Sequence, residues 1–240
     1  MDLAELSWTD ARDADVEVVL LPVGSTEQHG PHAPLGTDWM LAEAVAERGV
    51  AASDRSALIA PTLPIGIAEE HGGFTGTLWV SPDTFRQSIR EVVTSIAQHG
   101  WTRVIVVNGH GGNVDALGEV CAAITREGIA RCVPFTWFQS IDLPADVPMG
   151  HAGAVETAAM LATRPDLVHE DRTEAAAAAA AERWGEWVAG VNLAVSSDEF
   201  TENGVVGDPS IADLELGESV LTEASEHLAT VIDTIVEEGW

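Results

Sequence analysis

Residues 16–32 read VEVVLLPV-GSTEQHGPH. The first eight are mostly apolar and rich in valine, a composition typical of a strand buried on both faces of a parallel sheet. The next nine combine turn-forming glycine and proline with a carboxylate and two imidazoles. In an open parallel sheet, ligands bind beyond the carboxyl ends of the strands. The stretch therefore predicts a central strand that ends at a functional loop.

Strand-like and helix-like segments alternate along the next hundred residues. Further strands are predicted at 58–60, 104–107 and 130–135. Helices are predicted after a cap at Thr37 or Asp38, after Ser81-Pro82-Asp83 to about Gln98, and after Asn113 to about Arg126. This alternation implies right-handed crossovers and helices on both faces of the sheet. The predicted fold class is α/β, a three-layer α/β/α sandwich with a mainly parallel sheet.

The chain after Gly150 has mainly helical patterns. Helices are predicted at 152–163, at 174–187, which includes seven consecutive alanines, and at about 216–236. The apolar face of the last helix is expected to pack in the core rather than to form an interface; it consists of Val220, Leu221, Leu228, Val231, Ile232 and Ile235. Because neither a repeat nor an interdomain linker is visible, we predict one domain over 1–240.

Composition excludes several classes of protein. Hydrophobic residues make up 46% of the 240, enough for a sizeable core and too many for a disordered chain. No apolar run approaches the ~20 residues of a membrane span, and residues 1–5 lack the layout of a signal peptide. Cys121 and Cys132 are too few for a disulfide framework and are typical of core residues in a reducing compartment. We therefore expect a cytoplasmic location.

Charge is the most unusual property of the chain. Acidic residues number 39 and basic residues 11, all of them arginine, so the formal net charge is −28. Neither nucleic acid nor an anionic membrane is expected as a partner, because both need a basic surface. An acidic surface without lysine is typical of adaptation to molar salt, where charge repulsion is screened. The composition predicts a halophilic protein, of archaeal source.

Two loops at predicted strand ends contain residue types that bind metals. The first includes Glu27 and His29, which project to the same side of an extended segment, and it leads to Asp38. The second, Asn108-Gly-His-Gly-Gly-Asn113, places His110 where glycines allow close approach. Two carboxylates and two imidazoles suit Zn²⁺, Mn²⁺ or Fe²⁺. A carboxylate such as Asp38 between two histidines is able to bridge two ions.

Each residue also has an ordinary explanation when it is taken alone. Glu27 fits a solvated loop acid, and Asp38 fits a helix cap. His110 fits a phosphate-binding loop in which backbone N–H groups hold the anion. The four residues together, at one end of a sheet, favour the metal site.

Two further segments contribute candidates. His151 precedes a predicted helix and is a candidate general acid or base, while Glu156 is a candidate ligand or orienting partner in catalysis. Alternatively, they are a capped helix start and an ordinary acid. Glu70 and His71 either line the mouth of a substrate site or belong to a polar loop. We predict substrate-binding roles for Glu70, His71 and Asn113.

Five ordered motifs resemble the creatininase (creatinine amidohydrolase) family. They are Gly24-Ser-Thr-Glu-Gln-His-Gly-Pro-His32, Gly36-Thr-Asp38, Glu70-His-Gly-Gly-Phe-Thr-Gly76, Asn108-Gly-His-Gly-Gly-Asn113 and Gly150-His-Ala-Gly-Ala-Val-Glu-Thr157. The resemblance covers about Val16 to Thr157. It implies a creatininase-like α/β/α fold, two divalent metal ions, hydrolysis of a non-peptide C–N bond of a small amide by a metal-activated water, and a homo-oligomer, often a hexamer.

Carried onto this chain, the resemblance assigns one ion to Glu27, Asp38 and His110, and the other to His29 and Asp38. Creatininase has a further glutamate ligand where this chain has Gly112. Glu156 or water would then complete the second site. The chain also has Val147-Pro148-Met149 where a tryptophan that covers the substrate is expected. The resemblance implies that His151 protonates the leaving nitrogen.

The sequence does not identify the substrate. The Gly112 form of the loop resembles two other branches of the family: an archaeal formylaminopyrimidine ribonucleotide deformylase of flavin and deazaflavin biosynthesis, and the mycofactocin precursor peptidase. The inferred halophilic source favours the deformylase, and creatinine amidohydrolase is the other alternative. A non-catalytic module that binds the phosphate of a nucleotide is the alternative of a different class.

The net charge of −28 leads to a prediction about salt. In a few millimolar KCl the helical signal in far-UV circular dichroism should fall, and it should be restored at molar KCl, because the Debye length shrinks to ~3 Å at 1 M. A spectrum that is the same in both solutions would show that the fold does not depend on salt.

Overall fold

The computed structural model describes residues 1–145 and 147–239. Its main sheet has four strands, which are β1 (Val18–Val23), β2 (Ala57–Ile59), β3 (Arg103–Asn108) and β4 (Arg131–Thr136). The spatial order is β2-β1-β3-β4, and every neighbouring pair is parallel. The predicted parallel sheet is confirmed, and each predicted strand lies within two residues of an observed one.

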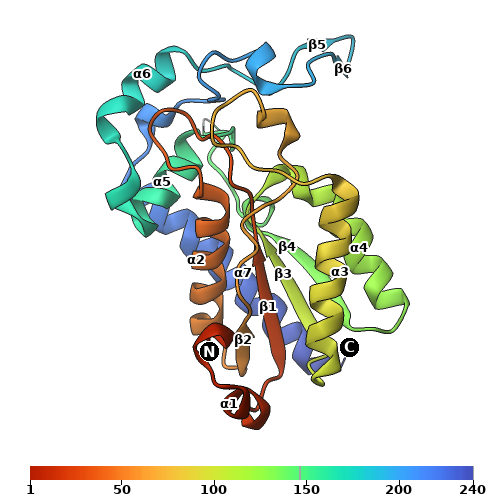
Figure 1. Ribbon diagram of the computed structural model, residues 1–240. Helices are drawn as coiled ribbons and strands as arrows, with labels where there is room; N and C mark the ends of the chain where they lie inside the picture. Colours follow the sequence, from red (N-terminus) through yellow and green to blue (C-terminus); the bar gives the residue numbers. More distant parts are fainter. Residues whose placement is uncertain (146, 240) are drawn as a thin grey trace.

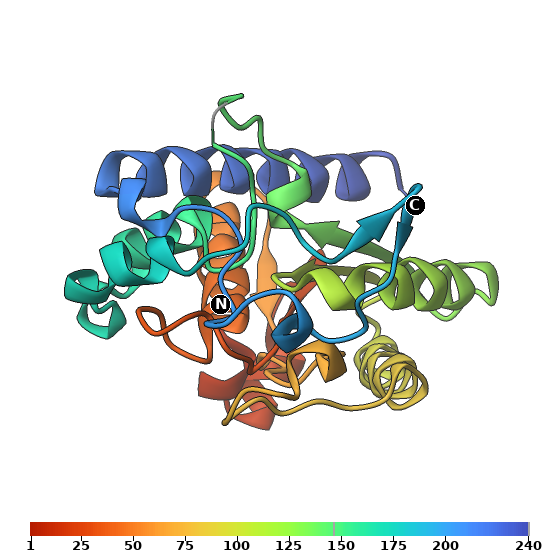
Figure 2. The same cartoon turned by 90° about the horizontal axis from the view of Figure 1, so that it is seen from above.

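Helices cover both faces of this sheet (Figures 1 and 2). One layer contains α2 (Thr37–Ala52), α5 (Ala154–Thr163) and α7 (Leu214–Glu237). The other contains α3 (Pro82–Gln98) and α4 (Val114–Arg126). The three-layer α/β/α sandwich is therefore confirmed.

Successive side chains of β1 point to opposite faces of the sheet, and each face is covered by one layer of helices. Val18 and Leu20 point into the core beneath α2, α5 and α7, whereas Val19 and Leu21 point into the core beneath α3 and α4. Every residue of β1 is buried, as expected for a strand covered on both faces. The two cores together hold the carboxyl ends of the strands at one rigid edge.

Helix α7 confirms the predicted core packing. Its buried residues include Val220, Leu221, Leu228, Ile232 and Ile235, while Val231 is partly buried against the same core. Both cysteines are free and buried, as expected for core residues. Within the described residues, no helix combines the length and apolar character needed to cross a bilayer.

The predicted helix at 174–187 is wrong beyond its first turns. Helix α6 spans Thr173–Ala178. Ala181 then donates its N–H to the Val205 carbonyl and accepts from Gly207, so its backbone groups pair with a distant segment instead of with the helix. Alanine's helix propensity is worth only a fraction of a kcal/mol per residue, and tertiary pairing overrides it. The chain continues into a small antiparallel hairpin, β5 (Trp187–Val188) and β6 (Val191–Asn192).

Two predicted helix starts also need correction. Helix α2 begins at Thr37 with Gly36 as its cap residue, so neither Thr37 nor Asp38 caps it. The Thr37 hydroxyl donates to the Pro34 carbonyl. Helix α5 begins at Ala154 rather than at Ala152, because Ala152 has a positive φ of 51°.

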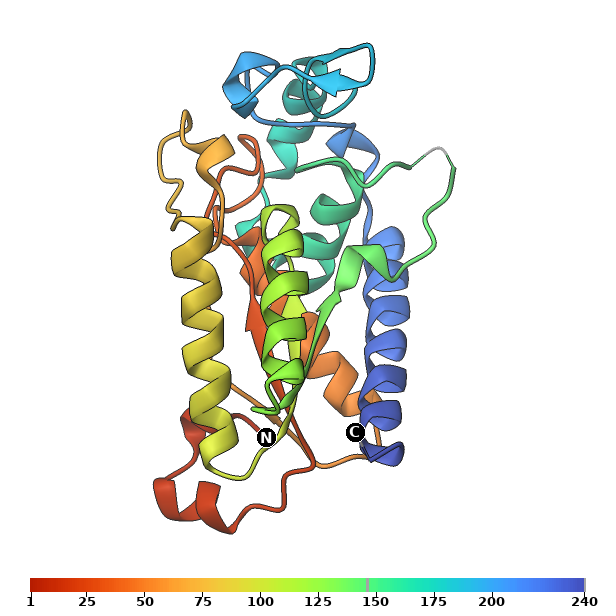
Figure 3. The same cartoon turned by 90° about the vertical axis from the view of Figure 1, so that its right-hand side faces the viewer.

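The remaining elements lie at the two ends of the molecule. Helix α1 (Trp8–Asp13) lies below the sheet, and the short hairpin β5–β6 lies above its carboxyl edge (Figures 1 and 3). The segments that follow β1, β2, β3 and β4 all emerge at this upper edge. The fold therefore gathers four loops and the hairpin around one place.

Substitution of Gly217 in α7 tests how closely α7 packs against α5. A Cβ at Gly217 would lie 2.0 Å from the Ala158 carbonyl oxygen of α5, whereas a Cβ at Gly118 of α4 would meet nothing within 4 Å. Gly217→Ala should destabilise the protein by about 1–3 kcal/mol through overpacking. Gly118→Ala, the matched control, should stabilise it by about 0.5–1 kcal/mol. Thermal unfolding measures both, and equal melting temperatures would contradict the tight α5–α7 contact.

Candidate metal centre and its cavity

Six predicted site residues converge at the carboxyl edge of the sheet. Glu27 and His29 follow β1, Asp38 lies in the first turn of α2, and His110 follows β3. His151 and Glu156 lie in the segment after β4 and at the start of α5. All six are buried. Among the described residues their donor atoms form two groups of three within 4.8 Å, Glu27 with Asp38 and His110, and His29 with His151 and Glu156. A third group combines Glu27 and His151 with His71.

Asp38 lies between two histidines. Its Oδ1 is 3.1 Å from Nε2 of His29, and its Oδ2 is 3.1 Å from Nδ1 of His110. The two oxygens therefore face different rings. This is the arrangement of a carboxylate that bridges two cations.

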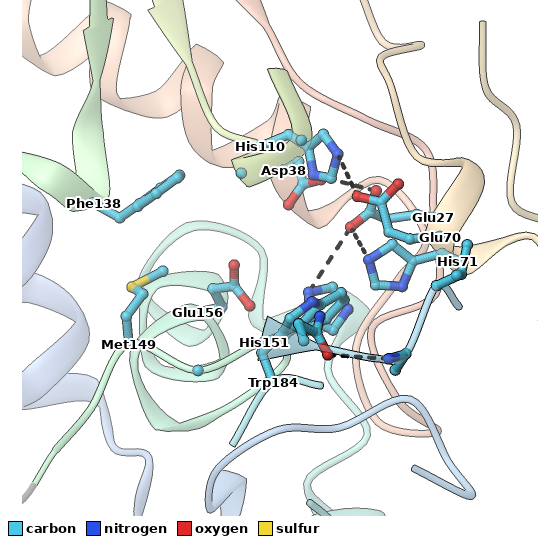
Figure 4. Close-up of a pocket in the computed structure, with 16 residues that line it drawn as sticks. Glu27, Asp38, Glu70, His71, His110, Phe138, Met149, His151, Glu156 and Trp184 are labelled. Carbon is cyan, nitrogen blue, oxygen red and sulfur yellow. Dashed lines mark hydrogen bonds and ion pairs between the residues drawn. The ribbon is translucent and has the colours of Figure 1, made fainter. Parts of the chain in front are cut away.

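Each side of Asp38 has a second carboxylate. On the His110 side, Glu27 Oε2 lies 3.3 Å from Nδ1 of His110. On the His29 side, Glu156 Oε2 lies 3.9 Å from Nε2 of His29 and also accepts the N–H of Ala152 at 2.6 Å. Two sets of nitrogen and oxygen donors thus share one aspartate (Figure 4, where Glu27, Asp38, His110 and Glu156 are labelled).

Several of these buried atoms lack hydrogen-bond partners. Both carboxylate oxygens of Glu27, Oδ2 of Asp38 and Nε2 of His29 make no hydrogen bond within the described residues. Unpaired buried polar atoms are costly and rare in native proteins. Lone pairs that converge without donors fit a cation, and mixed imidazole and carboxylate donors suit Zn²⁺, Mn²⁺ or Fe²⁺. The residues present therefore fit a metal centre.

Backbone carbonyls orient both of the rings that face Asp38. Nε2 of His110 lies 2.6 Å from the Ile67 carbonyl, and Nδ1 of His29 lies 3.3 Å from the Glu27 carbonyl. The nitrogen next to a carbonyl carries the first ring proton, so the nitrogen that faces Asp38 is the one that binds a metal ion or a second proton. Histidines that bind metals are held in this manner.

The pKa values show how strongly this centre attracts a positive charge. Burial acts to lower the pKa of His29, but Asp38, Glu156 and Glu27 outweigh it and raise that pKa to about 9. The pKa of His110 is likewise raised well above its ordinary value, against burial, by Glu27 and Asp38. Burial raises the pKa of Glu156 to about 7. In the absence of a metal ion, protons are the cations that these carboxylates hold.

His71 and His151 behave differently, because Gln28 lies between them. Gly30 donates its N–H to Oε1 of Gln28, so the amide nitrogen of Gln28 donates to Nδ1 of His71 at 2.8 Å. Nε2 of His71 then carries the proton and faces Glu27 at 3.3 Å. Burial and neighbouring histidines lower the pKa of His71 to about 3. His71 is therefore a neutral ring that orients Glu27.

His151 keeps one nitrogen free for chemistry. Its Nε2 lies 2.8 Å from the Gln28 carbonyl and donates to it. Its Nδ1 faces Glu27 Oε1 at 3.9 Å. Burial, then His29 and His71, lower its pKa well below the ordinary value. His151 is thus neutral, with an available lone pair.

A cavity of about 470 Å³ opens above these residues. Its polar lining includes Glu27, Asp38, Glu70, His71, His110, His151 and Glu156. Its apolar lining includes Phe138, Met149, Trp184, Ala194 and Val195 (Figure 4). Glu70 and His71 therefore line the cavity, and their substrate-binding role stays a prediction. Asn113 is buried outside this lining, where its amide binds Gly24, Ile67 and Asn108 and holds the loops together.

Comparison with known proteins agrees with this geometry. The sequence profile of the family described as "Creatininase: Creatinine amidohydrolase" matches residues 4–232. The chain belongs to the creatininase family. It is accordingly a metal-dependent amidohydrolase, an enzyme that hydrolyses C–N bonds.

Three similar proteins illustrate this membership. A mycofactocin precursor peptide peptidase of Mycolicibacterium smegmatis is 39% identical over 216 residues, covering 87% of this chain and 81% of the relative. A creatinine amidohydrolase of Pseudomonas putida is 32% identical over 195 residues, covering 71% and 74%. A solved manganese form of creatininase has a TM-score of 0.79 and 25% identity, covering 99% of this chain and 98% of that one.

Gly112 lies where this creatininase-family chain has no space for a side chain. A Cβ at position 112 would lie 2.2 Å from the Ile67 carbonyl oxygen and 2.6 Å from Nε2 of His110. A larger residue would push Ile67 away from the ring that it orients. The carboxylate beside His29 comes instead from Glu156.

Sequence reasoning missed Trp184 and Gln28. The ring of Trp184 lies 5.3 Å from that of His71 and 5.9 Å from that of His151, and it closes one side of the cavity. Trp184 falls within the helix predicted at 174–187, so its sequence position offered no reason to place it at the site. Gln28 lies between Glu27 and His29, and its spacing carried no separate signal.

The raised pKa values of His29 and Glu156 lead to a prediction about pH. In the metal-free protein, protons bound to these groups stabilise the fold fully at low pH, and this stabilisation is lost as pH rises through about 7 and then about 9. A divalent ion displaces the same protons, so its apparent affinity should rise with pH up to about 9. Calorimetry with Mn²⁺ between pH 6 and 9, in buffers of different ionisation enthalpy, measures both the affinity and the proton release. Constant affinity across this range would contradict the assignment.

Proposed function

We propose that this protein binds two divalent ions and hydrolyses an amide bond in the cavity above them. Glu27, Asp38 and His110 would hold one ion, and His29, Asp38 and Glu156 the other. The observation that carries the proposal is the position of Asp38, whose two oxygens each lie 3.1 Å from a different imidazole nitrogen. Zinc, manganese and iron all suit these donors.

The reaction requires a nucleophile and a proton carrier. Divalent ions supply Lewis acidity, which polarises a carbonyl and makes water more acidic. Nδ1 of His151 is the proton carrier in this proposal, because it faces the centre with a free lone pair. It takes a proton from the attacking water and returns it to the leaving nitrogen. The Gln28 carbonyl and His71 keep His151 and Glu27 oriented during this transfer.

The substrate that we favour is a short linear amide of the peptide type, in place of the non-peptide C–N bond that the resemblance alone implies. The apolar wall of Phe138, Met149 and Trp184 suits an apolar side chain next to the amide carbonyl. Relatives named mycofactocin precursor peptide peptidase, 35–39% identical to this chain, support the same choice.

Creatinine is the second candidate, supported by the creatinine amidohydrolase relative. The deformylase role and the nucleotide-phosphate module stay predictions from the sequence. Both need a phosphate, and none of the described residues that line the cavity is an arginine in a chain without lysine.

A cytoplasmic location, a homo-oligomer such as a hexamer, adaptation to molar salt and a single domain over 1–240 also stay predictions. Analytical ultracentrifugation in molar KCl measures the oligomeric state directly.

The proposal is tested by elemental analysis and a substrate screen. Protein purified without chelator in molar KCl should contain about two equivalents of Zn, Mn or Fe. The metal-loaded protein should hydrolyse at least one of three compounds: a short peptide with an aromatic residue near its C-terminus, creatinine, or a formylated aminopyrimidine phosphate. Chelation should abolish turnover. A metal-free protein that hydrolyses none of them but binds nucleotide tightly would establish the module instead.

Two variants separate the ligands from the proton carrier. Asp38→Asn should lose both ions and all turnover, because it removes the charge that the two sites share, while Asp115→Asn, an exposed aspartate in the first turn of α4, should keep both. His151→Ala should keep its metal and lose about 10²–10⁴-fold in kcat. Loss of metal in His151→Ala would make His151 a ligand.

A further inference from the structure

We propose that Glu70 makes the cavity selective for substrates that carry a positively charged amine beside an apolar group. Glu70 belongs to the short 3₁₀ helix Glu69–His71, in the segment after β2. The inference rests on the proposed function, because it names the class of molecule that the same cavity takes.

The carboxylate of Glu70 is free to accept hydrogen bonds. Within residues 1–145 and 147–239 it accepts none, and its nearest charged contact is Nε2 of His110 at 4.0 Å. The proton on that nitrogen is already donated to the Ile67 carbonyl at 2.6 Å. The side chain is 27% exposed, and that exposed part faces the cavity. Two carboxylate oxygens are thus available to a ligand.

Neighbouring groups hold Glu70 in this position. Its carbonyl accepts hydrogen bonds from the hydroxyls of Ser196 at 3.1 Å and Ser197 at 2.9 Å. Gly112 provides the space, since a Cβ there would lie 2.9 Å from Oε1 of Glu70. These contacts hold the backbone of Glu70, and its carboxylate lies over the glycine loop, beside the metal donors (Figure 4).

Glu70 differs in role from the other carboxylates of the cavity. Glu27, Asp38 and Glu156 each belong to a group of three donor atoms within 4.8 Å, and Glu70 belongs to none of these groups. Its charge is therefore not needed to hold an ion. A carboxylate placed in this way can bind the N–H groups of a ligand.

The surroundings define the chemical class of that ligand. Arginine is absent from the described lining, so no side-chain guanidinium lies beside Glu70 to bind a phosphate or carboxylate, and such a group would bind at the proposed metal ions instead. An ammonium group would form a charge-assisted hydrogen bond there. Trp184, Met149 and Val195 line the cavity with apolar surface. A primary ammonium with an apolar or aromatic side group, such as the free N-terminus of a short peptide, satisfies both features.

A binding experiment tests the assignment without turnover. The probes are 2-phenylethylammonium and its neutral analogue 2-phenylethanol, titrated calorimetrically into the metal-loaded wild type, Glu70→Gln and Glu69→Gln in molar KCl. Glu69 is exposed in the same 3₁₀ helix and lies outside the cavity lining, so it is the matched control. The wild type and Glu69→Gln should bind the ammonium at least tenfold more tightly than the alcohol. Glu70→Gln should reduce that ratio to near one.

Charge reversal gives a second readout. The substrate is an amide that the protein hydrolyses, prepared in two forms: one with a free amine and one in which that amine is succinylated. The wild type should have the higher kcat/KM for the free amine, and Glu70→Arg should have the higher kcat/KM for the succinylated form. Elemental analysis should find the same metal content in each variant. An unchanged probe ratio in Glu70→Gln, or loss of metal from it, would overturn the assignment.

The two proposals fail separately. A wild type that binds the ammonium selectively through Glu70 but hydrolyses no amide would overturn the proposed function and leave the amine site. A wild type that hydrolyses amides with the same selectivity in Glu70→Gln would leave the function and overturn the role of Glu70.

Discussion

The structure of the site depends on Asp38, a buried carboxylate between two imidazoles. Removing carboxylates from water is costly unless a cation compensates them, and here Glu27, Asp38 and Glu156 are buried within one small volume. The unpaired carboxylate oxygens of Glu27 show that hydrogen bonds within the protein do not provide this compensation. A cation does, either as protons on His29 and His110 or as divalent ions.

The fold supplies what this centre needs, at some local cost. Parallel strands β1, β3 and β4 end at one edge, so segments distant in sequence meet there. Helix α2 has no side-chain cap at its start, because its cap residue is Gly36, while the carboxylate of Asp38 in its first turn faces the histidines. Carbonyls of Ile67 and Glu27 orient the two rings. Helix α2 thus lacks the stabilisation of a side-chain cap, whereas the two histidine rings are held in place.

A different part of the chain forms part of the apolar wall of the cavity. The segment that follows α6 leaves the helix, pairs with Val205–Gly207 and brings Trp184 over the cavity. Ser196 and Ser197, farther along the same excursion, hold Glu70. The candidate metal donors and this apolar wall therefore come from different segments of the chain.

The sequence by itself determined the fold class and pointed to the candidate metal donors. Buried parallel strands are read from short runs of β-branched residues, and glycine-rich loops with histidine and carboxylate at strand ends point to one edge of the sheet. Only the tertiary structure decided that the two oxygens of Asp38 face different rings, that Gln28 sets the tautomer of His71, and that Trp184 lies in the cavity. These are contacts between residues far apart in the chain, and local propensity carries no information about them. The alanine tract shows the same limit, because one pairing with Val205 outweighed the helix preference of its last residues.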